Sequence, residues 1–254
     1  MEALGSVDKA IDVLFHLHRQ PGAQGVTAIG RALGLPKSSA HRLLAALGGR
    51  GLVERDDRGQ YRPGMGLVAL GLGALDREPV VAAAMPVLEA EAEALGETVF
   101  LVGARAGRPV VLGKAEGTGF LRAAPRVGEP VPVHATAVGK LFLAFGGGVL
   151  AAPEGELERF TARTRTSAAT LEREVRRVRE QGFAENREEW IPGLAVIAAP
   201  ILRSVPGEPS PRMAGALAVA APAARLEALG PASVAARARA AAARIAVNLE
   251  GESS

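Results

Sequence analysis

Apolar residues recur every three or four positions in three segments of the first 50 residues, and this spacing gives a helix one buried face. The sequence therefore predicts three helices, at residues 6–20, 28–33 and 36–49. Ser6 and Thr27 are the expected N-caps of the first two, because their short side chains accept hydrogen bonds from the first helical turn.

A short hairpin is predicted after the third helix. Residues 51–55 favour a strand, residues 56–59 have turn chemistry, and residues 60–62 favour a returning strand. Three helices followed by a small hairpin are typical of a winged helix-turn-helix, whose recognition helix enters the DNA major groove. Arg58 lies at the tip of this wing, where it either contacts DNA or belongs to an ordinary solvated turn.

Helical periodicity returns at Met65, with apolar residues at Leu67, Leu70 and Leu75, and breaks at residues 76–79. This segment is the predicted linker helix. We expect its apolar face to pack against a second copy of the chain, because this face would otherwise be exposed to solvent. A further helix is predicted at residues 80–95, with Glu89, Glu91 and Glu93 pointing outward.

From residue 97 the periodicity changes to two, which favours strands. Strands are predicted at residues 98–103, 109–114, 195–202 and 213–220, with shorter candidates at Leu121-Arg122 and from residue 183. Helices are predicted at residues 134–144, 171–181 (capped by Thr170) and 232–249. The expected fold is α+β: a winged helix-turn-helix at residues 1–63, a linker helix at 64–78, and a domain with a mainly antiparallel sheet at 79–254.

Composition excludes several classes of protein. The 254 residues are 48% hydrophobic and include no cysteine, which rules out disulfides and thiolate metal sites and suits a reducing cytoplasm. The sequence shows no N-terminal signal pattern and no apolar run of the ~18 residues that a membrane span needs. We therefore expect a cytoplasmic protein without a membrane partner.

Positive charge is concentrated at the N-terminal end. Residues 1–63 contain nine Lys or Arg against six Asp or Glu, whereas residues 64–254 contain 21 of each (30 less 9, and 27 less 6). The excess of three, equal to the net charge of the whole chain, favours an anionic partner for the N-terminal part, although a solvated basic surface would give the same count.

The third helix carries the candidate DNA contacts. Its apolar face is expected to pack on a core, while small polar and basic residues occupy the opposite face of its first turns: Lys37, Ser38, Ser39, His41 and Arg42. Such side chains reach phosphates and base edges, and a helix N-terminus itself attracts phosphate. Arg42 is the strongest candidate, and Arg31 on the second helix is expected to touch the DNA backbone or form a local ion pair.

Motifs of enzymes and cofactor sites are incomplete. Residues 137–140 (AVGK) lack the first glycine and the Ser or Thr of a phosphate-binding loop, and Gly71 and Gly73 lack the third glycine of a dinucleotide site. His134 has neither a nucleophile elbow nor metal-ligand spacing around it, so a structural or pocket-edge role is favoured over catalysis. We expect no catalytic residue, no metal and no cofactor.

Four blocks of the sequence resemble the IclR family of bacterial transcriptional regulators. They are residues 33–44 (LGLPKSSAHRLL), residues 59–64 (GQYRPG), residues 131–140 (VPVHATAVGK), and a group formed by residues 182–184 (GFA), 188–189 (EE), 192–193 (PG) and 198–201 (AAPI). The resemblance implies a winged-helix DNA-binding domain, a linker helix and a GAF-like effector domain. It also implies dimers, often paired into tetramers, on double-stranded operator DNA, without enzymatic activity.

The resemblance further implies a pocket for a small metabolite, often an organic acid or an aromatic compound. Carried over by position, the pocket residues are Val131, His134, Ala137, Val138, Asn186, Leu194 and Val196. Two positions depart from the family, which commonly has cysteine at Val196 and an acidic residue at Asn186. Arg122, Arg126, Arg187 and Arg203 are additional candidate partners for a carboxylate.

Two other functions remain open from the sequence. One is an enzyme dependent on His134 that uses its N-terminal helices only for dimerisation. The other is a sensor or scaffold whose winged helix binds protein, which would lack the steep salt dependence of DNA binding. The sequence does not identify the effector, the operator, repression versus activation, or dimer versus tetramer.

Overall fold

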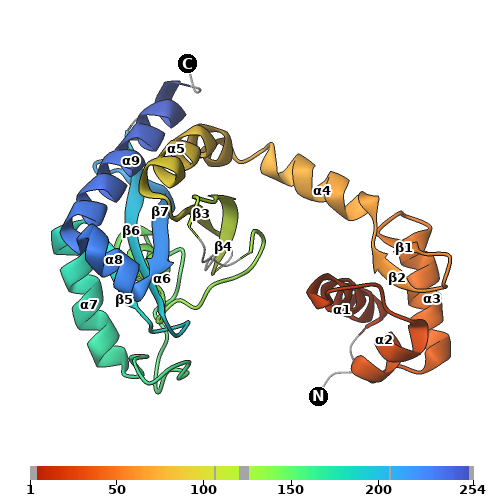
Figure 1. The fold of residues 1–254 in the computed structure, drawn as a ribbon. Coiled ribbons are helices and arrows are strands. Elements are labelled where there is room, and N and C mark those ends of the chain that lie inside the picture. Colours follow the sequence, from red (N-terminus) through yellow and green to blue (C-terminus); the bar gives the residue numbers. More distant parts are fainter. Residues whose placement is uncertain (1–4, 106, 120–125, 206, 252–254) are drawn as a thin grey trace. The chain divides into compact units, whose positions relative to one another are not determined.

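Separate hydrophobic cores organise the two halves of the chain. A computed structural model describes residues 5–105, 107–119, 126–205 and 207–251 (Figure 1). The chain divides into two compact units, Met1–Arg77 and Glu78–Ser254, which are called the N-terminal and C-terminal units below.

The N-terminal unit has three helices, a hairpin and a fourth helix in sequence. Its elements are α1 (Ser6–Arg19), α2 (Val26–Ala32), α3 (Lys37–Gly48), β1 (Val53–Arg55), β2 (Tyr61–Pro63) and α4 (Met65–Leu75). The apolar faces predicted from the sequence form its core, in which Val13, Ile29 and Leu44 are fully buried. Tyr61 joins the hairpin to this core and also exchanges two backbone hydrogen bonds with Gln24, both 2.8 Å long.

The N-caps of three helices differ from the prediction by one to three residues. α1 is capped by Gly5 rather than Ser6, because the Asp8 carboxylate accepts a hydrogen bond from the Gly5 backbone amide at 3.0 Å. α2 is likewise capped by Gly25 rather than Thr27. In the C-terminal unit, α7 (Ala168–Gln181) is capped by Ser167 rather than Thr170, since two alanines extend the helix toward its N-terminus.

The C-terminal unit is built on a five-stranded antiparallel sheet. Its strands are β3 (Thr98–Arg105), β4 (Arg108–Ala115), β5 (Ala184–Arg187), β6 (Leu194–Arg203) and β7 (Arg212–Pro222), in the spatial order β4-β3-β7-β6-β5. The pairing of β6 with β7 runs from Leu194 opposite Pro222 to Arg203 opposite Arg212. The strand candidate Leu121-Arg122 lies outside the described residues.

Helices cover both faces of this sheet (Figure 1). α5 (Pro79–Leu95), α8 (Ala223–Leu229) and α9 (Pro231–Gly251) pack with Leu101, Ile197 and Val219 in one core. α6 (Ala137–Phe145) packs on the other face, against Phe100, Val196 and Ala218. Alternate residues of each strand therefore enter different cores, which explains why β6 is an almost continuous apolar run. Within the described chain, no helix is long and apolar enough to cross a membrane.

Two features of the C-terminal unit differ from the sequence prediction. Glu91, expected to point outward, is buried, where Arg237 donates a hydrogen bond to it and Arg244 lies 2.6 Å away. A glutamate so placed is stabilised by two guanidinium groups from α9, which local periodicity does not reveal. The short helix α8 was not predicted, because it continues directly from the end of β7.

The start of α6 is fixed by Thr136 and Gly139. The Thr136 hydroxyl accepts a hydrogen bond from the Gly139 amide at 3.1 Å, so the helix begins at Ala137 rather than at His134 as predicted. A Cβ atom at Gly139 would lie 2.1 Å from the Val133 carbonyl oxygen. The segment before α6 therefore packs directly on the backbone of the helix, an approach that only glycine permits.

Replacing Gly139 with alanine should destabilise the C-terminal unit by about 1–3 kcal/mol, because the added methyl group overlaps the Val133 carbonyl. Urea unfolding followed by the fluorescence of Trp190, the single tryptophan, measures this loss. Gly71→Ala is the matched control, since a Cβ at that helical glycine of the N-terminal unit meets nothing within 4 Å. An unchanged midpoint for Gly139→Ala would contradict the prediction.

Candidate functional site

The exposed face of α3 presents most of the residues predicted to contact DNA. Lys37, Ser38, His41 and Arg42 are exposed on its first turns, and Ser39 is half-buried. Ala40, Leu44 and Leu47 are buried on the other side of the helix. The helix is thus held by its apolar face and leaves its polar face open to a partner.

The basic side chains of this surface have no partner among the residues that the structure describes. Within the described chain, neither a hydrogen bond nor an ion pair involves the side chain of Lys37, Arg42, Arg31 or Arg58. Arg31 is exposed on α2, and Arg58 is exposed at the turn between β1 and β2. Cations that are not neutralised by neighbouring carboxylates are free to pair with an anionic ligand.

The turn between α2 and α3 is tight. Gly34 adopts a φ of 63°, which favours glycine, and the Leu35 amide donates to the Gly30 carbonyl at 2.8 Å. A Cβ atom at Gly30 would lie only 2.9 Å from the Leu35 carbonyl oxygen. These two glycines let α2 and α3 approach closely and fix the direction of α3.

The turn of the wing is held by Asp56. Its carboxylate accepts hydrogen bonds from the amides of Arg58 at 3.0 Å and Gln60 at 2.8 Å, and Gly59 has a φ of 75°. This Asx-type turn defines the backbone that carries the exposed Arg58 side chain.

Glu54 connects the wing to the start of α4. Its carboxylate accepts a hydrogen bond from the Met65 amide at 2.9 Å and pairs with Arg62 at 3.1 Å. These interactions, the Met65 hydrogen bond foremost, hold the pKa of Glu54 below its ordinary value of 4.5. A Cβ atom at Gly64 would lie 2.3 Å from the Gly51 carbonyl oxygen, so the hairpin and the helix start are in direct backbone contact.

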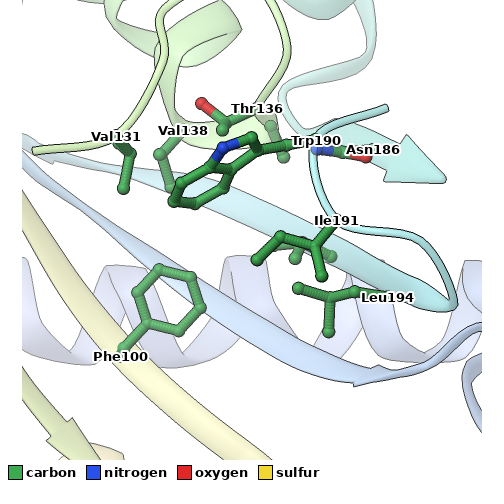
Figure 2. A pocket seen from close by; sticks show the side chains of 10 residues that line it. Phe100, Val131, Thr136, Val138, Asn186, Trp190, Ile191 and Leu194 are labelled. Atoms are coloured by element: carbon green, nitrogen blue, oxygen red, sulfur yellow. The ribbon is translucent and has the colours of Figure 1, made fainter. Parts of the chain in front are cut away.

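The C-terminal unit contains a cavity between the sheet and α6 (Figure 2). Six residues expected from the family resemblance line it: Val131, Ala137, Val138, Asn186, Leu194 and Val196. Four further lining residues were not predicted, namely Phe100, Thr136, Trp190 and Ile191. Trp190 and Ile191 come from the loop between β5 and β6, where sequence periodicity carries no information about which residues point inward.

Asn186 is buried at the edge of the cavity and uses both ends of its amide. Its nitrogen donates to the Ala135 carbonyl oxygen, and its oxygen accepts from the Glu189 amide at 3.0 Å. An acidic residue, which the family commonly has here, could not donate to Ala135 when ionised. The presence of asparagine instead of an acidic residue at position 186 therefore fits the hydrogen bonds formed there.

His134 does not line the cavity, contrary to the expectation. Its Nε2 atom lies 2.8 Å from the Glu158 carbonyl oxygen, which can only accept, and its ring stacks on Phe160 at 5.6 Å between centroids. The residue is buried and joins the segment before α6 to the segment that precedes α7. Both contacts are those of a structural histidine, and neither partner is a nucleophile.

The arginines considered as carboxylate partners are not at the cavity wall either. Arg126, Arg187 and Arg203 are exposed and absent from the cavity lining. Arg187 is hydrogen-bonded to Glu185, which raises the pKa of the guanidinium above its ordinary value. Arg122 lies outside the described residues.

Lys140 forms a buried ionic cluster beside the cavity. Its ammonium group is 2% exposed and lies 2.7 Å from both Glu174 of α7 and Glu189 of the β5–β6 loop. Arg165 also pairs with Glu174, at 2.9 Å. Glu188, beside Glu189, pairs with Arg163 at 3.0 Å. The described residues contain no cluster of three His, Cys, Asp or Glu side chains able to hold a metal ion.

Family models match both units of the chain. The IclR helix-turn-helix domain matches residues 6–57, and the model described as bacterial transcriptional regulator IclR C-terminal matches residues 72–247. The first match covers α1 to β1, and the second begins within α4 and covers the cavity-bearing sheet and its helices.

Relatives of known name and structure are similar over most of their length. The HTH-type transcriptional regulator XynR of Escherichia coli (strain K12) is 33% identical over 206 residues, which cover 79% of this chain and 81% of XynR. The HTH-type transcriptional repressor AllR of Salmonella typhi is 28% identical over 228 residues, 87% of this chain and 81% of AllR. A solved IclR homolog from Microbacterium hydrocarbonoxydans, complexed with 4-hydroxybenzoate, has a TM-score of 0.81 at 26% identity and covers 97% of this chain and 100% of its own.

The contact between Glu54 and α4 should make the stability of the N-terminal unit depend on pH. Because the pKa of Glu54 is lowered on folding, its contribution is present above the ordinary value of 4.5 and is lost as the pH falls through the lower folded pKa. We expect Glu54→Gln to be less stable than the wild type at neutral pH, with the difference shrinking below pH 4.5.

Thermal unfolding of both proteins by far-UV circular dichroism, over a series of pH values, measures this difference. Arg62→Gln is the matched comparison and should show a weaker pH dependence of the same sign, since Met65 is the larger cause of the shift. A difference between Glu54→Gln and the wild type that stays constant from neutral to acidic pH would rule out the lowered pKa.

Proposed function

The chain belongs to the IclR family of bacterial transcriptional regulators, and we propose that it binds operator DNA through α3 under the control of a small molecule bound in the C-terminal unit. Its relatives are named transcriptional regulators and repressors, so it is a regulator with a helix-turn-helix domain and a C-terminal effector domain, not an enzyme. We assign DNA binding to residues 1–63, the linker to 64–78 and effector binding with oligomerisation to 79–254.

The polar face of α3 is the proposed DNA interface. Lys37, Ser38, Ser39, His41 and Arg42 are placed at the major groove, with Arg42 as the main contact to a base or phosphate. Arg31 is assigned to the DNA backbone and Arg58 to the minor groove or its phosphates. The observation that carries this assignment is the absence, within the described chain, of any ion pair to these exposed cations. We also propose a cytoplasmic location, which is consistent with a DNA partner.

The cavity of the C-terminal unit is the proposed effector site. We assign effector contacts to Val131, Ala137, Val138, Asn186, Leu194 and Val196, and withdraw His134 from this set because it is engaged elsewhere. The effector is proposed to be an organic acid or an aromatic compound. One solved homolog in complex with 4-hydroxybenzoate supports this chemistry.

The regulator is proposed to act as a homodimer, with pairing of dimers into tetramers as a further step. No residue of α4, all of which are described, is buried, although Met65, Leu70 and Leu72 are apolar and 67%, 65% and 57% exposed. Phe15 of α1 is also 56% exposed. Apolar surface of this kind is favourably covered by a second copy, which would place two α3 helices at fixed spacing.

Effector binding is proposed to change the relative placement of the two recognition helices through residues 64–95. A coupling free energy of about 1–3 kcal/mol between the effector and DNA sites is enough for such a switch. The contact of Glu54 with Met65 supports this route, because it ties the wing to the first residue of α4.

Arg42→Ala should weaken binding to DNA from the region upstream of the chain's own gene by about 5- to 150-fold, the loss of one specific contact worth ~1–3 kcal/mol. Fluorescence anisotropy with the labelled duplex measures it, and the wild-type affinity should fall steeply with added salt. Arg173→Ala, which removes an exposed arginine from α7, is the matched control and should bind as the wild type does. Equal affinities for all three proteins would remove Arg42 from the interface.

Replacing Val68 and Leu72 together with serine should shift the protein from dimer to monomer, because these exposed side chains lie four residues apart on one face of α4, the proposed interface. Sedimentation velocity at low micromolar concentration detects the change, and circular dichroism checks that the fold is kept. A double variant that remains dimeric would place the main dimer contact elsewhere.

A further inference from the structure

The cavity of the C-terminal unit is filled by a side chain of the protein itself. Its remaining free volume is about 20 Å³, enough for one water molecule and too little for any metabolite. Figure 2 shows the indole of Trp190 extending from its loop into this space, toward Val131 and Val138. Trp190 is half-buried, so its ring enters the cavity from the surface.

The cavity walls match a flat apolar ring. Phe100, Val138 and Leu194 surround the indole, and all three belong to the sheet-and-α6 core rather than to the loop that carries Trp190. All three side chains are buried in this core. Removal of the indole would therefore leave a site of about the size and polarity of an aromatic ring system.

Polar groups of the cavity are already satisfied. The Thr136 hydroxyl donates to the Pro132 carbonyl and accepts from Gly139, and the Asn186 amide is used by Ala135 and Glu189. None of the ten described residues that line the cavity carries a charge. A carboxylate placed here would lose its hydration without gaining a cation among these residues, which strongly disfavours it.

We propose that the effector is an uncharged aromatic molecule of one or two rings that takes the place of the Trp190 indole. This proposal rests on the assignment of the cavity as the effector site, and it selects the aromatic class over the organic acids. Trp190 then acts as an internal competitor, and the effector binds only the fraction of molecules in which the indole has left the cavity.

The loop that carries Trp190 is anchored on both sides of this residue. Glu189 is bound to Lys140 through both carboxylate oxygens, at 2.7 and 2.8 Å, and its carbonyl accepts from Thr164 at 2.6 Å. On the other side Gly193, which is exposed and has a φ of 77°, donates from its amide to the Glu188 carboxylate at 2.9 Å and accepts from the Ala223 amide at 2.8 Å. The indole therefore leaves by rotation of the Trp190 side chain between these two anchors, while the buried Lys140 pair stays intact.

Two isosteric probes test the ligand class. The wild type is titrated with 4-hydroxybenzoate and with its neutral counterpart 4-hydroxybenzamide while the emission of Trp190, the single tryptophan, is recorded. We expect the amide to bind at least about tenfold more tightly than the acid, because only the acid buries a charge. Its binding should shift the emission to longer wavelength, since the indole moves into water. Equal or tighter binding of the acid, or amide binding without a shift, overturns the proposal.

Trp190 variants test the competition. Trp190→Ala should bind 4-hydroxybenzamide about tenfold more tightly than the wild type, because its cavity is open in advance. Trp190→Phe is the matched control, which keeps an aromatic ring in the cavity and should bind close to the wild-type affinity. Calorimetry measures both, with circular dichroism as the check on folding. A folded Trp190→Ala protein that binds neither 4-hydroxybenzamide nor indole overturns the proposal.

Operator binding distinguishes this proposal from the proposed function. Amide binding with the emission shift but with unchanged DNA affinity supports the exchange with Trp190 and contradicts effector control of DNA binding. Conversely, a ligand that changes DNA affinity while the Trp190 emission stays constant supports effector control and overturns the exchange.

Discussion

The buried ammonium group of Lys140 is the constraint on which the site in the C-terminal unit depends. A lysine that is 2% exposed must be paired, and here Glu174 and Glu189 approach it from different elements. The cluster thus ties α6 to α7 and to the loop between β5 and β6, and removal of the Lys140 charge would leave the buried Glu189 with only a 3.9 Å contact to Arg165. Because Glu189 is held in this way, the next residue, Trp190, starts from a fixed point and its ring is directed to the cavity.

The same requirement to satisfy buried polar groups explains the character of the cavity. Thr136 caps α6, and Asn186 bridges the segment before α6 and the loop after β5. The side chains of both residues therefore form their hydrogen bonds with backbone groups. What remains for a ligand is apolar surface from Phe100, Val138 and Leu194. The polar residues at the cavity are thus structural supports, and specificity is left to shape and to the absence of charge among the described lining residues.

Hydrophobic periodicity and turn residues predicted the parts of the structure that depend on interactions between residues close in the sequence. The three helices of the N-terminal unit, the wing and the antiparallel sheet follow from periodicity and turn residues, and the structure confirms them. Six of the cavity residues came instead from the family resemblance. The pairing of Glu91 with two arginines of α9, the partners of His134 and the inward position of Trp190 were missed, because each depends on residues far apart in the sequence.

The two units differ more in how many of their charged side chains form ion pairs than in their net charge. In the C-terminal unit many arginines are matched by carboxylates, as with Arg237 and Arg244 around Glu91, so its equal numbers of acids and bases correspond to physical pairs. On α3 the described side chains of Lys37 and Arg42 have no such match. An excess of three charges in the N-terminal residues is small as a number, but unpaired cations on one helix face produce a local potential that paired cations elsewhere do not. The position of the unpaired charges, and not their total, therefore favours an anionic partner at α3.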